Sequence, residues 1–259
     1  MRRRDLLRMV ATFLLLSAKL RARGATPASR VRPSDPDWPT LEQWDELKSA
    51  VGGHLIQPKA LASPCQEGAQ APECIDLLKQ LRNPYYIGDQ PSGTQVSGWL
   101  DAWTPAPSAY AVLAHTGADV VAAVNFAREH RLRLVVKGGA HSYQGTSNAA
   151  DSLLIWTRAM REIQLHEQFV PKGAHVSPQP AVTVGAGAVW MDVYDAVTTK
   201  GGRYAQGGGC TTVGVAGHIQ SGGFGSFSKG YGTAAGSLLE AEVVTADGKL
   251  RTGQCRSRP

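Results

Sequence analysis

Two glycine-rich segments hold the side chains best suited to chemistry, His141 in the first and Cys210 in the second. The first segment runs from Val135 to Gly145, and its glycines let backbone N–H groups approach a ligand without a Cβ in the way. Consecutive N–H groups in such a turn form a concave site for phosphate. Hydroxyl donors are available nearby on Ser142, Thr146 and Ser147. By composition alone, an ordinary strand-to-loop turn with a solvent-facing histidine is the simpler interpretation.

The second segment runs from Gly207 to Gly225 and places Cys210 in a loop. So many glycines carry a large entropic cost on folding, and close approach by a large flat ligand explains them better than chance. A structural cysteine more often lies in an apolar run. A flexible linker is a weak alternative, because apolar residues that demand burial are interleaved with the glycines: Val213, Val215, Ile219 and Phe224.

Other kinds of site find less support in the sequence. The segment Val182–Gly187 resembles the start of a dinucleotide-binding fingerprint, but Trp190 stands at the third glycine position and no suitable acidic residue follows. P-loop, HExxH and paired CxxC patterns are absent from the sequence, which leaves phosphoryl transfer and structural zinc unsupported. A metal held by His141, His218 and Cys210 is an alternative, although no carboxylate or close ligand spacing joins these residues.

Hydrophobic periodicity predicts the elements that position the two loops. A strand over 109–114, a helix from Thr116 to about His130 and a strand over 132–136 form a unit that ends at the first glycine segment. Thr116 and Asp119 have the spacing of a capping box. Further elements are a helix over 41–50, a strand over 180–185, a helix over 189–200 that carries Val193 and Val197 on one face, and a strand over 238–245 followed by an Asp247-Gly248 hairpin turn.

The charge of the chain is confined to its beginning. The net charge of +6 equals that of residues 1–25, which hold seven basic side chains against Asp5, so the rest is formally neutral and a nucleic-acid partner loses its support. The apolar run from Met9 to Ala18 is shorter than the ~20 residues that cross a bilayer. Residues 1–25 therefore predict a signal peptide, and Arg3-Arg4 resembles a twin-arginine export motif. We expect an exported protein, periplasmic or secreted, with no membrane anchor after cleavage.

Cys65 and Cys74 lie close together in the sequence, in a polar stretch with two prolines. An exported protein of this kind often carries disulfides, and we expect a local Cys65–Cys74 bridge. The alternative is two free thiols, with Cys74 buried on a helix indicated by Ile75, Leu78 and Leu81.

The motifs Gly138-Gly139-x-His141-Ser142 and Cys210-x-x-Val213-Gly214-Val215 resemble those of FAD-binding (PCMH-type) domains of the vanillyl-alcohol-oxidase type, specifically the berberine-bridge-enzyme-like oxidases. The resemblance runs from about Trp99 to Leu250 and implies an α+β fold with two α/β subdomains. It also implies FAD attached twice, by His141 at the 8α-methyl group and by Cys210 at C6. The remaining FAD-binding residues that it implies are Gly138, Gly139, Ala140, Ser142, Tyr143, Gly145, Thr146, Gly209, Val213, Gly214, Gly217, His218, Gly222, Gly223, Gly225, Val243 and Val244.

The sequence departs from the family at Ala216, where a glycine is usual, and at Gly236-Ser237, where Asp-Asn is frequent. The expected organisation is a signal peptide (1–25), a lead-in and start of the FAD domain (26–100), the FAD domain (101–252) and a tail (253–259). The family's substrate domain, which supplies the catalytic base, is missing from this arrangement. We therefore name no catalytic base, and we expect the chain to be inactive alone.

The resemblance implies an oxidase that takes a hydride from a C–H bond of an alcohol or carbohydrate, a small-molecule substrate, and passes the electrons to O₂. Val213 and Val215 are candidates to line the oxygen route, but the sequence does not distinguish an oxidase from a dehydrogenase, nor does it indicate an oligomeric state. A function of another class stays open, namely a non-catalytic flavin-binding remnant of a truncated oxidase gene.

Overall fold

The computed structural model of the chain describes residues 30–95 and 106–254. The described residues from Val31 onward belong to one compact unit. The predicted signal peptide and its twin-arginine motif lie outside the described residues, so these stay predictions.

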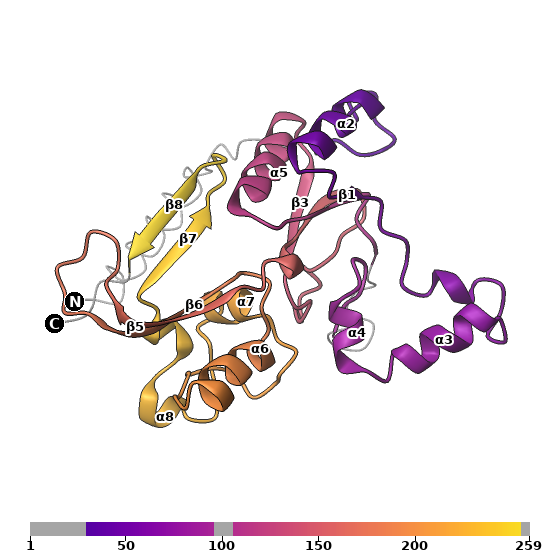
Figure 1. The fold of residues 1–259 in the computed structure, drawn as a ribbon. Helices are drawn as coiled ribbons and strands as arrows, with labels where there is room; N and C mark the ends of the chain where they lie inside the picture. Colours follow the sequence, from indigo (N-terminus) through magenta and orange to yellow (C-terminus); the bar gives the residue numbers. More distant parts are fainter. Residues whose placement is uncertain (1–29, 96–105, 255–259) are drawn as a thin grey trace, which may run out of the picture. The chain divides into compact units, whose positions relative to one another are not determined.

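The first glycine segment begins in one strand of a four-stranded sheet (Figure 1). Its strands are β1 (Leu55–Ile56), β2 (Tyr110–Leu113), β3 (Arg133–Lys137) and β4 (Ser152–Trp156), in the order β1-β2-β4-β3. Strand β4 pairs in parallel with both β2 and β3, while β1 is antiparallel to β2. β4 is hydrogen-bonded on both edges, and all five of its residues are buried. The predicted strand–helix–strand unit is confirmed, with a third parallel strand between its two strands.

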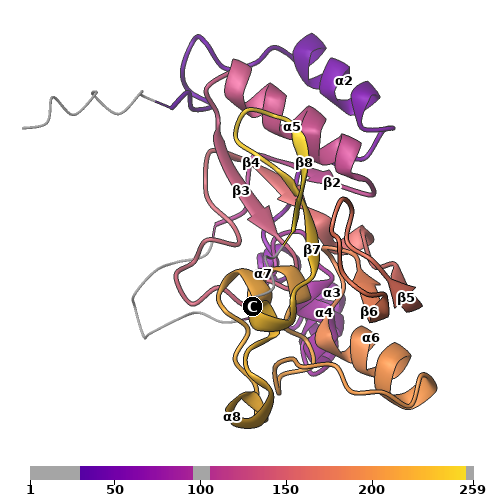
Figure 2. The same ribbon diagram turned by 90° about the vertical axis from the view of Figure 1, so that its left-hand side faces the viewer.

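Helix α5 (Gly117–Glu129) connects β2 to β3 and begins with the predicted capping box. Thr116 Oγ1 accepts a hydrogen bond from the Asp119 N–H, and Asp119 Oδ2 accepts one from the Thr116 N–H at 2.9 Å. The buried side of α5 packs against the sheet and against Trp44 and Leu47 of α2 (Leu41–Ala50), which lies beside it in Figures 1 and 2. This cluster is the largest apolar core among the described residues.

A second apolar cluster surrounds helix α6 (Trp190–Tyr194), which continues as a π-helical segment over Asp195–Lys200. Trp190, Val193 and Val197 pack together with Val215. This confirms the predicted helix with Val193 and Val197 on one face. The cluster joins the antiparallel pair β5 (Ile163–Phe169) and β6 (Gln179–Val184) to helix α7 (Val215–Gln220) and the 3-10 turn η4 (Ala234–Ser237).

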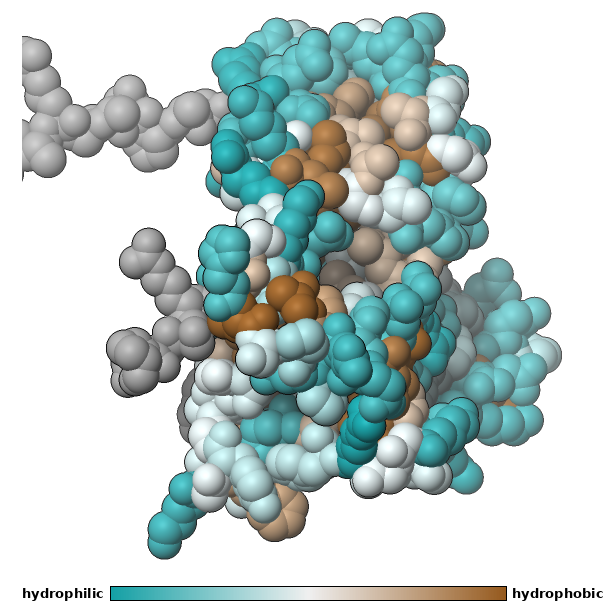
Figure 3. Space-filling model, turned by 60° about the vertical axis from the view of Figure 1, so that its left-hand side comes forward, coloured by the Kyte–Doolittle hydropathy of each residue, from teal (hydrophilic) through white to brown (hydrophobic). Residues whose placement is uncertain are grey.

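The predicted hairpin at Asp247-Gly248 joins β7 (Glu240–Val244) to β8 (Leu250–Gln254). Asn125 and Arg128 of α5 donate hydrogen bonds to the two turn carbonyls, of Gly248 at 3.4 Å and of Asp247 at 3.3 Å. Val243 and Leu250 of this hairpin are half exposed. Figure 3 shows hydrophobic side chains in several patches on one face of the molecule. The hairpin therefore contacts helix α5 mainly through its turn, and part of its surface is open to solvent.

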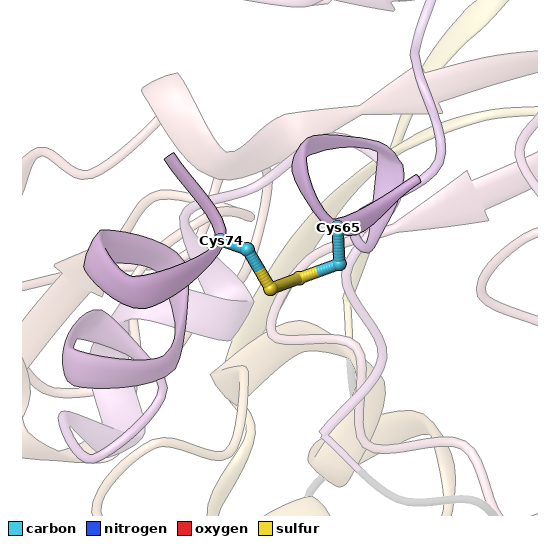
Figure 4. The surroundings of a disulfide bond; sticks show 2 residues. All are labelled: Cys65 and Cys74. Carbon is cyan, nitrogen blue, oxygen red and sulfur yellow. A yellow bond between two sulfur atoms is a disulfide. The ribbon is translucent and has the colours of Figure 1, made fainter. Parts of the chain in front are cut away.

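A disulfide joins Cys65, in the short 3-10 turn η1 (Ser63–Cys65), to Cys74 of helix α3 (Pro72–Gln80), as Figure 4 shows. The predicted bridge is confirmed, and the alternative of two free thiols is wrong. The buried residues of α3 are Cys74 and Leu77, whereas Ile75 and Leu78 are exposed. The helix that Ile75, Leu78 and Leu81 indicated is present as α3 with Cys74 buried on it, although Ile75 and Leu78 do not lie on its buried face.

Lys137, the last residue of β3, is only 1% exposed and lies just before the first glycine segment. Its Nζ donates hydrogen bonds to the carbonyls of Gln90 at 2.8 Å, Gly93 at 3.3 Å and Pro91. The ammonium group also lies 5.2 Å from the ring centroid of Trp156. Among the ion pairs of the described residues, none involves Lys137. This lysine ties the segment after helix α4 (Pro84–Gly88) to the sheet.

Burial lowers the pKa of Lys137 to about 7 from its ordinary 10.5, so the protonated form is disfavoured in the folded state. Between these two values the unfolded chain binds more protons, and the free energy of unfolding should rise with pH. We expect the free energy of unfolding, measured with urea, to rise by up to about 1 kcal/mol per pH unit between about pH 7 and about pH 10. This rise should be absent in Lys137→Met. Lys79→Met, on the exposed side of α3, is the matched control and should keep the slope. An identical slope in Lys137→Met would contradict this assignment.

Candidate functional site

The fold brings His141 and Cys210 together at the hydroxyl of one residue, Thr212. Thr212 Oγ1 lies 2.8 Å from Nε2 of His141 and 3.5 Å from Sγ of Cys210. The Nε2 and Sγ atoms are therefore no farther apart than the sum of these two distances. Two loops that are about 70 residues apart in the sequence place both reactive side chains at one point.

The imidazole of His141 is half-buried, and this burial lowers its pKa below the ordinary 6.5. The ring is therefore neutral at pH 7, with one nitrogen carrying a lone pair. Nε2 is engaged by Thr212, whereas Nδ1 has no hydrogen bond to any residue that the structure describes. Nδ1 is thus the nitrogen left available for a ligand.

Ala140 sets the direction in which His141 leaves the first loop. Its φ angle of 62° lies in the left-handed region, which a residue with a Cβ adopts only at some cost. The Ala140 carbonyl accepts a hydrogen bond from the Gln95 N–H at 2.9 Å, and the Gln95 side chain donates to the Pro84 carbonyl at 2.7 Å. The segment between α4 and Gln95 therefore holds the strained residue in place.

The two loops touch through their backbones at Gly139 and Gly214. A Cβ on Gly139 would lie 2.5 Å from the Gly214 nitrogen, and a Cβ on Gly214 would lie 2.7 Å from the Gly139 nitrogen. These separations are below any real Cβ contact, so glycine is required on both sides. The need for glycine at these two positions comes from the protein's own packing.

The loop that carries Cys210 is pinned to helices on both sides. The N–H groups of Met191 and Trp190 donate to the carbonyls of Thr211 at 3.0 Å and Val213 at 3.1 Å. The hydroxyl of Tyr85, on α4, donates to Thr211 Oγ1 at 3.1 Å. The Cys210 side chain itself is a free, exposed thiol. A rigid loop thus presents a reachable sulfur.

The other predicted FAD-binding glycines fall into two groups. A Cβ on Gly225 would lie 1.9 Å from the Gly207 carbonyl oxygen, and one on Gly223 would meet Ala234 at 2.6 Å, so packing within the protein demands both. By contrast, a Cβ on Gly217 or Gly222 would point into open space. The second group leaves room for a ligand beside the backbone, as does Gly209, where a Cβ would meet only Ser226 Oγ at 3.9 Å.

Several other predicted site residues have protein partners of their own. His218 Nδ1 accepts a hydrogen bond from the Trp190 indole N–H at 3.0 Å, and its Nε2 therefore carries the proton that bonds the Phe224 carbonyl at 2.9 Å. The hydroxyls of Ser142 and Thr146 bond each other at 2.7 Å. One hydroxyl proton of that pair remains available as a donor, while His218 has both ring nitrogens in use.

The remaining predicted positions are peripheral to the point where His141 and Cys210 meet. Tyr143 is mostly exposed, Val243 is half exposed and Ser147 is buried. Val244 packs against the core around α5. Phe224 was expected to be buried, but it is 77% exposed, because its backbone carbonyl rather than its ring is held by His218. The predicted FAD contacts of these residues remain predictions.

Sequence reasoning missed Thr212, which contacts both site residues, and Arg158, which bonds Asp89 and the Gly187 carbonyl. Thr212 lies within the Cys210 motif, at a position where the motif specifies no residue. Arg158 is buried, with Nε 2.5 Å from Asp89 and Nη1 donating to the Gly187 carbonyl at 2.9 Å. The sequence does contain a signal for Arg158, because Thr157-Arg158 directly follows a run of apolar strand residues. Polar residues at the end of a buried strand are candidates for a site.

The described residues contain neither a candidate metal site nor a membrane-spanning helix. Within residues 30–95 and 106–254, no three His, Cys, Asp or Glu side chains gather closely enough to hold a metal ion. In the same part of the chain, no helix has the length and apolar character needed to cross a membrane.

The fold and the paired loops define a flavin-binding class of protein. Residues 107–253 match the FAD binding domain family, and because this match covers more than half of the chain, the chain belongs to that family.

Known proteins agree with this assignment. The chain is 32% identical over 267 residues to the FAD-linked oxidoreductase malF of Malbranchea aurantiaca, a match that covers 93% of this chain and 45% of that protein. The crystal structure of the VAO-type flavoprotein MtVAO615 of Myceliophthora thermophila C1 is 29% identical, with a TM-score of 0.75 over 87% of this chain and 44% of that one. The BBE-like 1 protein of Physcomitrella patens shares the fold, at 21% identity and a TM-score of 0.53 over 81% of this chain and 38% of that one.

The expected vanillyl-alcohol-oxidase-type fold, its mixed α/β class and the berberine-bridge-enzyme-like resemblance are confirmed. The chain spans about half the length of the curated relatives that it matches.

The two groups of glycines lead to a prediction that separates packing from ligand binding. Gly139→Ala should lower the free energy of unfolding of the FAD-free chain by about 1–3 kcal/mol, because its Cβ meets backbone atoms that cannot move aside. Gly217→Ala should be neutral or up to about 1 kcal/mol stabilising, because it lies on helix α7 with open space around it. Urea unfolding followed by circular dichroism measures both. A Gly139→Ala chain as stable as the unmutated one would show that the loops do not pack this closely.

Proposed function

We propose that this chain is the FAD-binding part of an FAD-dependent oxidoreductase in which His141 and Cys210 both form covalent bonds to the flavin. The observation that carries the proposal is the convergence of the two side chains on Thr212. The 8α-methyl group and C6 belong to the same benzenoid ring of the flavin. One flavin can bond both residues only if they lie close together, as they do here.

The residues present suit such a flavin. His141 is neutral because burial lowers its pKa, and Nδ1 is the ring nitrogen that has no hydrogen bond to any described residue. Cys210 is exposed, so its sulfur can reach a ligand. Gly217 and Gly222 leave space beside the backbone for a flat group. His141 and Cys210 would hold the ring system, with these glycines alongside it.

FAD bound in this way supplies the redox chemistry, accepting a hydride from a substrate C–H bond. The family resemblance favours a small-molecule substrate with an alcohol or carbohydrate C–H bond, and O₂ as the electron acceptor. The contribution of this chain is to fix the orientation of the ring through two bonded side chains and to prevent its loss. Among the described residues we assign no proton-accepting base.

We further propose that the protein is exported. The Cys65–Cys74 bridge supports an oxidising destination, because disulfides persist there and are rare in the cytosol. The sequence of residues 1–25, with Arg3-Arg4 before a short apolar run, supports a route that moves folded proteins.

The covalent attachment is tested by denaturing the FAD-loaded protein in acid. Visible absorbance should stay with the polypeptide, His141→Ala and Cys210→Ala should each retain one linkage, and the double variant should release all of its flavin. Peptide mapping by mass spectrometry identifies the remaining bond. His166→Ala, on exposed strand β5, is the control and should keep both bonds. Complete release of flavin from the unmutated protein would refute the proposal.

The export route is tested by replacing both arginines of the motif. Arg3→Lys with Arg4→Lys should trap the precursor in the cytoplasm of a host with a twin-arginine pathway, because that pathway recognises the arginine pair. Fractionation and immunoblotting measure the distribution. Unchanged export of the double variant would point to a general secretory signal instead.

A further inference from the structure

The hydroxyl of Thr212 is shared between the two residues proposed to bond the flavin. Thr212 is 6% exposed, and its Oγ1 lies 2.8 Å from His141 Nε2 and 3.5 Å from Cys210 Sγ. A threonine hydroxyl has one proton to donate and two lone pairs with which to accept. Its two lone pairs could accept from both Nε2–H and S–H, but the proton of this buried hydroxyl would then have no acceptor among the described residues. One contact is therefore assigned as donor and the other as acceptor.

Two arrangements of protons satisfy both contacts and also give the hydroxyl proton an acceptor. In the first, the His141 Nε2–H donates to Thr212, and the Thr212 hydroxyl donates to the Cys210 sulfur. In the second, the Cys210 S–H donates to Thr212, and the hydroxyl donates to Nε2, which puts the proton of the neutral imidazole on Nδ1. The first arrangement leaves the lone pair on Nδ1 and favours the anionic sulfur, and the second does neither.

We propose that Thr212 is a positioning residue that makes His141 and Cys210 ready for flavin attachment together, by holding the first arrangement. This inference rests on the proposed covalent attachment. Through its single proton, Thr212 links the tautomer of His141 to the state of the Cys210 sulfur, because a thiolate can only accept and an engaged Nε2–H can only donate. The thiolate is the reactive form of cysteine.

The backbone around Thr212 keeps the hydroxyl in this place. The carbonyls of its two neighbours, Thr211 and Val213, accept hydrogen bonds from the N–H groups of Met191 and Trp190. The Thr212 carbonyl oxygen faces Gly139, where a Cβ would approach it to 2.8 Å. The hydroxyl position is therefore determined by loop packing, and the side chain lies between His141 and Cys210 before any ligand is bound.

The experiment compares Thr212→Val, which keeps the shape and loses the hydroxyl, with Thr212→Ser, which keeps the hydroxyl. In the FAD-free protein, alkylation of Cys210 by iodoacetamide at neutral pH, followed by mass spectrometry of the Cys210 peptide, should be about fivefold slower in Thr212→Val and near the unmutated rate in Thr212→Ser. Circular dichroism checks that both variants fold. Equal alkylation rates in the Val variant and the unmutated protein would overturn the inference.

A second measurement needs no variant. The ¹⁵N chemical shifts of the His141 ring in the FAD-free protein distinguish the two tautomers. We expect the proton on Nε2, and a proton on Nδ1 would overturn the inference even if Thr212→Val does not fold.

After loading with FAD, the share of protein with both flavin bonds should fall in Thr212→Val and recover in Thr212→Ser. The proposed function is judged separately, by covalent flavin on the unmutated protein. The alkylation rate and the tautomer are measured without flavin, so a failure of the inference can be told apart from a failure of the proposed attachment.

Discussion

The close approach of two backbone segments at Gly139 and Gly214 is the contact on which the site depends. Without side chains at these two positions, the loops come near enough for the hydroxyl of Thr212 to reach both His141 and Cys210. A Cβ at Gly139 or Gly214 would lie 2.5 or 2.7 Å from a backbone nitrogen of the other loop, so the loops would have to move apart. Hydrogen bonds weaken steeply over such changes, so backbone packing controls the chemistry of the side chains.

Each loop has its own attachments, and one N-terminal segment contacts both loops. The His141 loop follows strand β3, and the 89–95 segment supports it through Gln95 and through the buried ammonium group of Lys137. The Cys210 loop is attached to the start of α6 and to Tyr85. Helix α4 and the residues after it contact both loops. The N-terminal part of the chain, which shows no catalytic motif, thereby serves as the support that sets the separation of the two loops.

Much of the framework was predictable from local patterns. The capping box at Thr116, the strand before the first glycine segment and the helix over 189–200 each follow from short-range periodicity or hydrogen bonding, and the structure confirms them. The family motifs indicated His141 and Cys210 as candidates. Their meeting point could not be derived, because it depends on a contact between loops far apart in the chain.

Other features escaped sequence reasoning for the same physical reason. The three carbonyl partners of Lys137 lie on a distant segment, and an isolated lysine is ordinarily expected at the surface. Phe224 was expected to be buried from its apolar character, but only its carbonyl is needed by His218. The glycines of the second segment were attributed to a ligand alone, whereas several are required by tertiary packing. In each case the decisive partner was not adjacent in sequence.

The position of β4 in the sheet imposes an order on assembly. β4 lies between β2 and β3 but follows both in the sequence. Until the ribosome has passed Trp156, β2 can pair only with β1, and β3 has no partner strand. The turn that carries His141 is part of the connection that returns the chain for this insertion. During synthesis, the histidine side of the site can therefore form first, and the cysteine loop docks onto it from a later stretch of chain. A newly made chain thus holds a half-built site for a time, with its imidazole in place before its thiol.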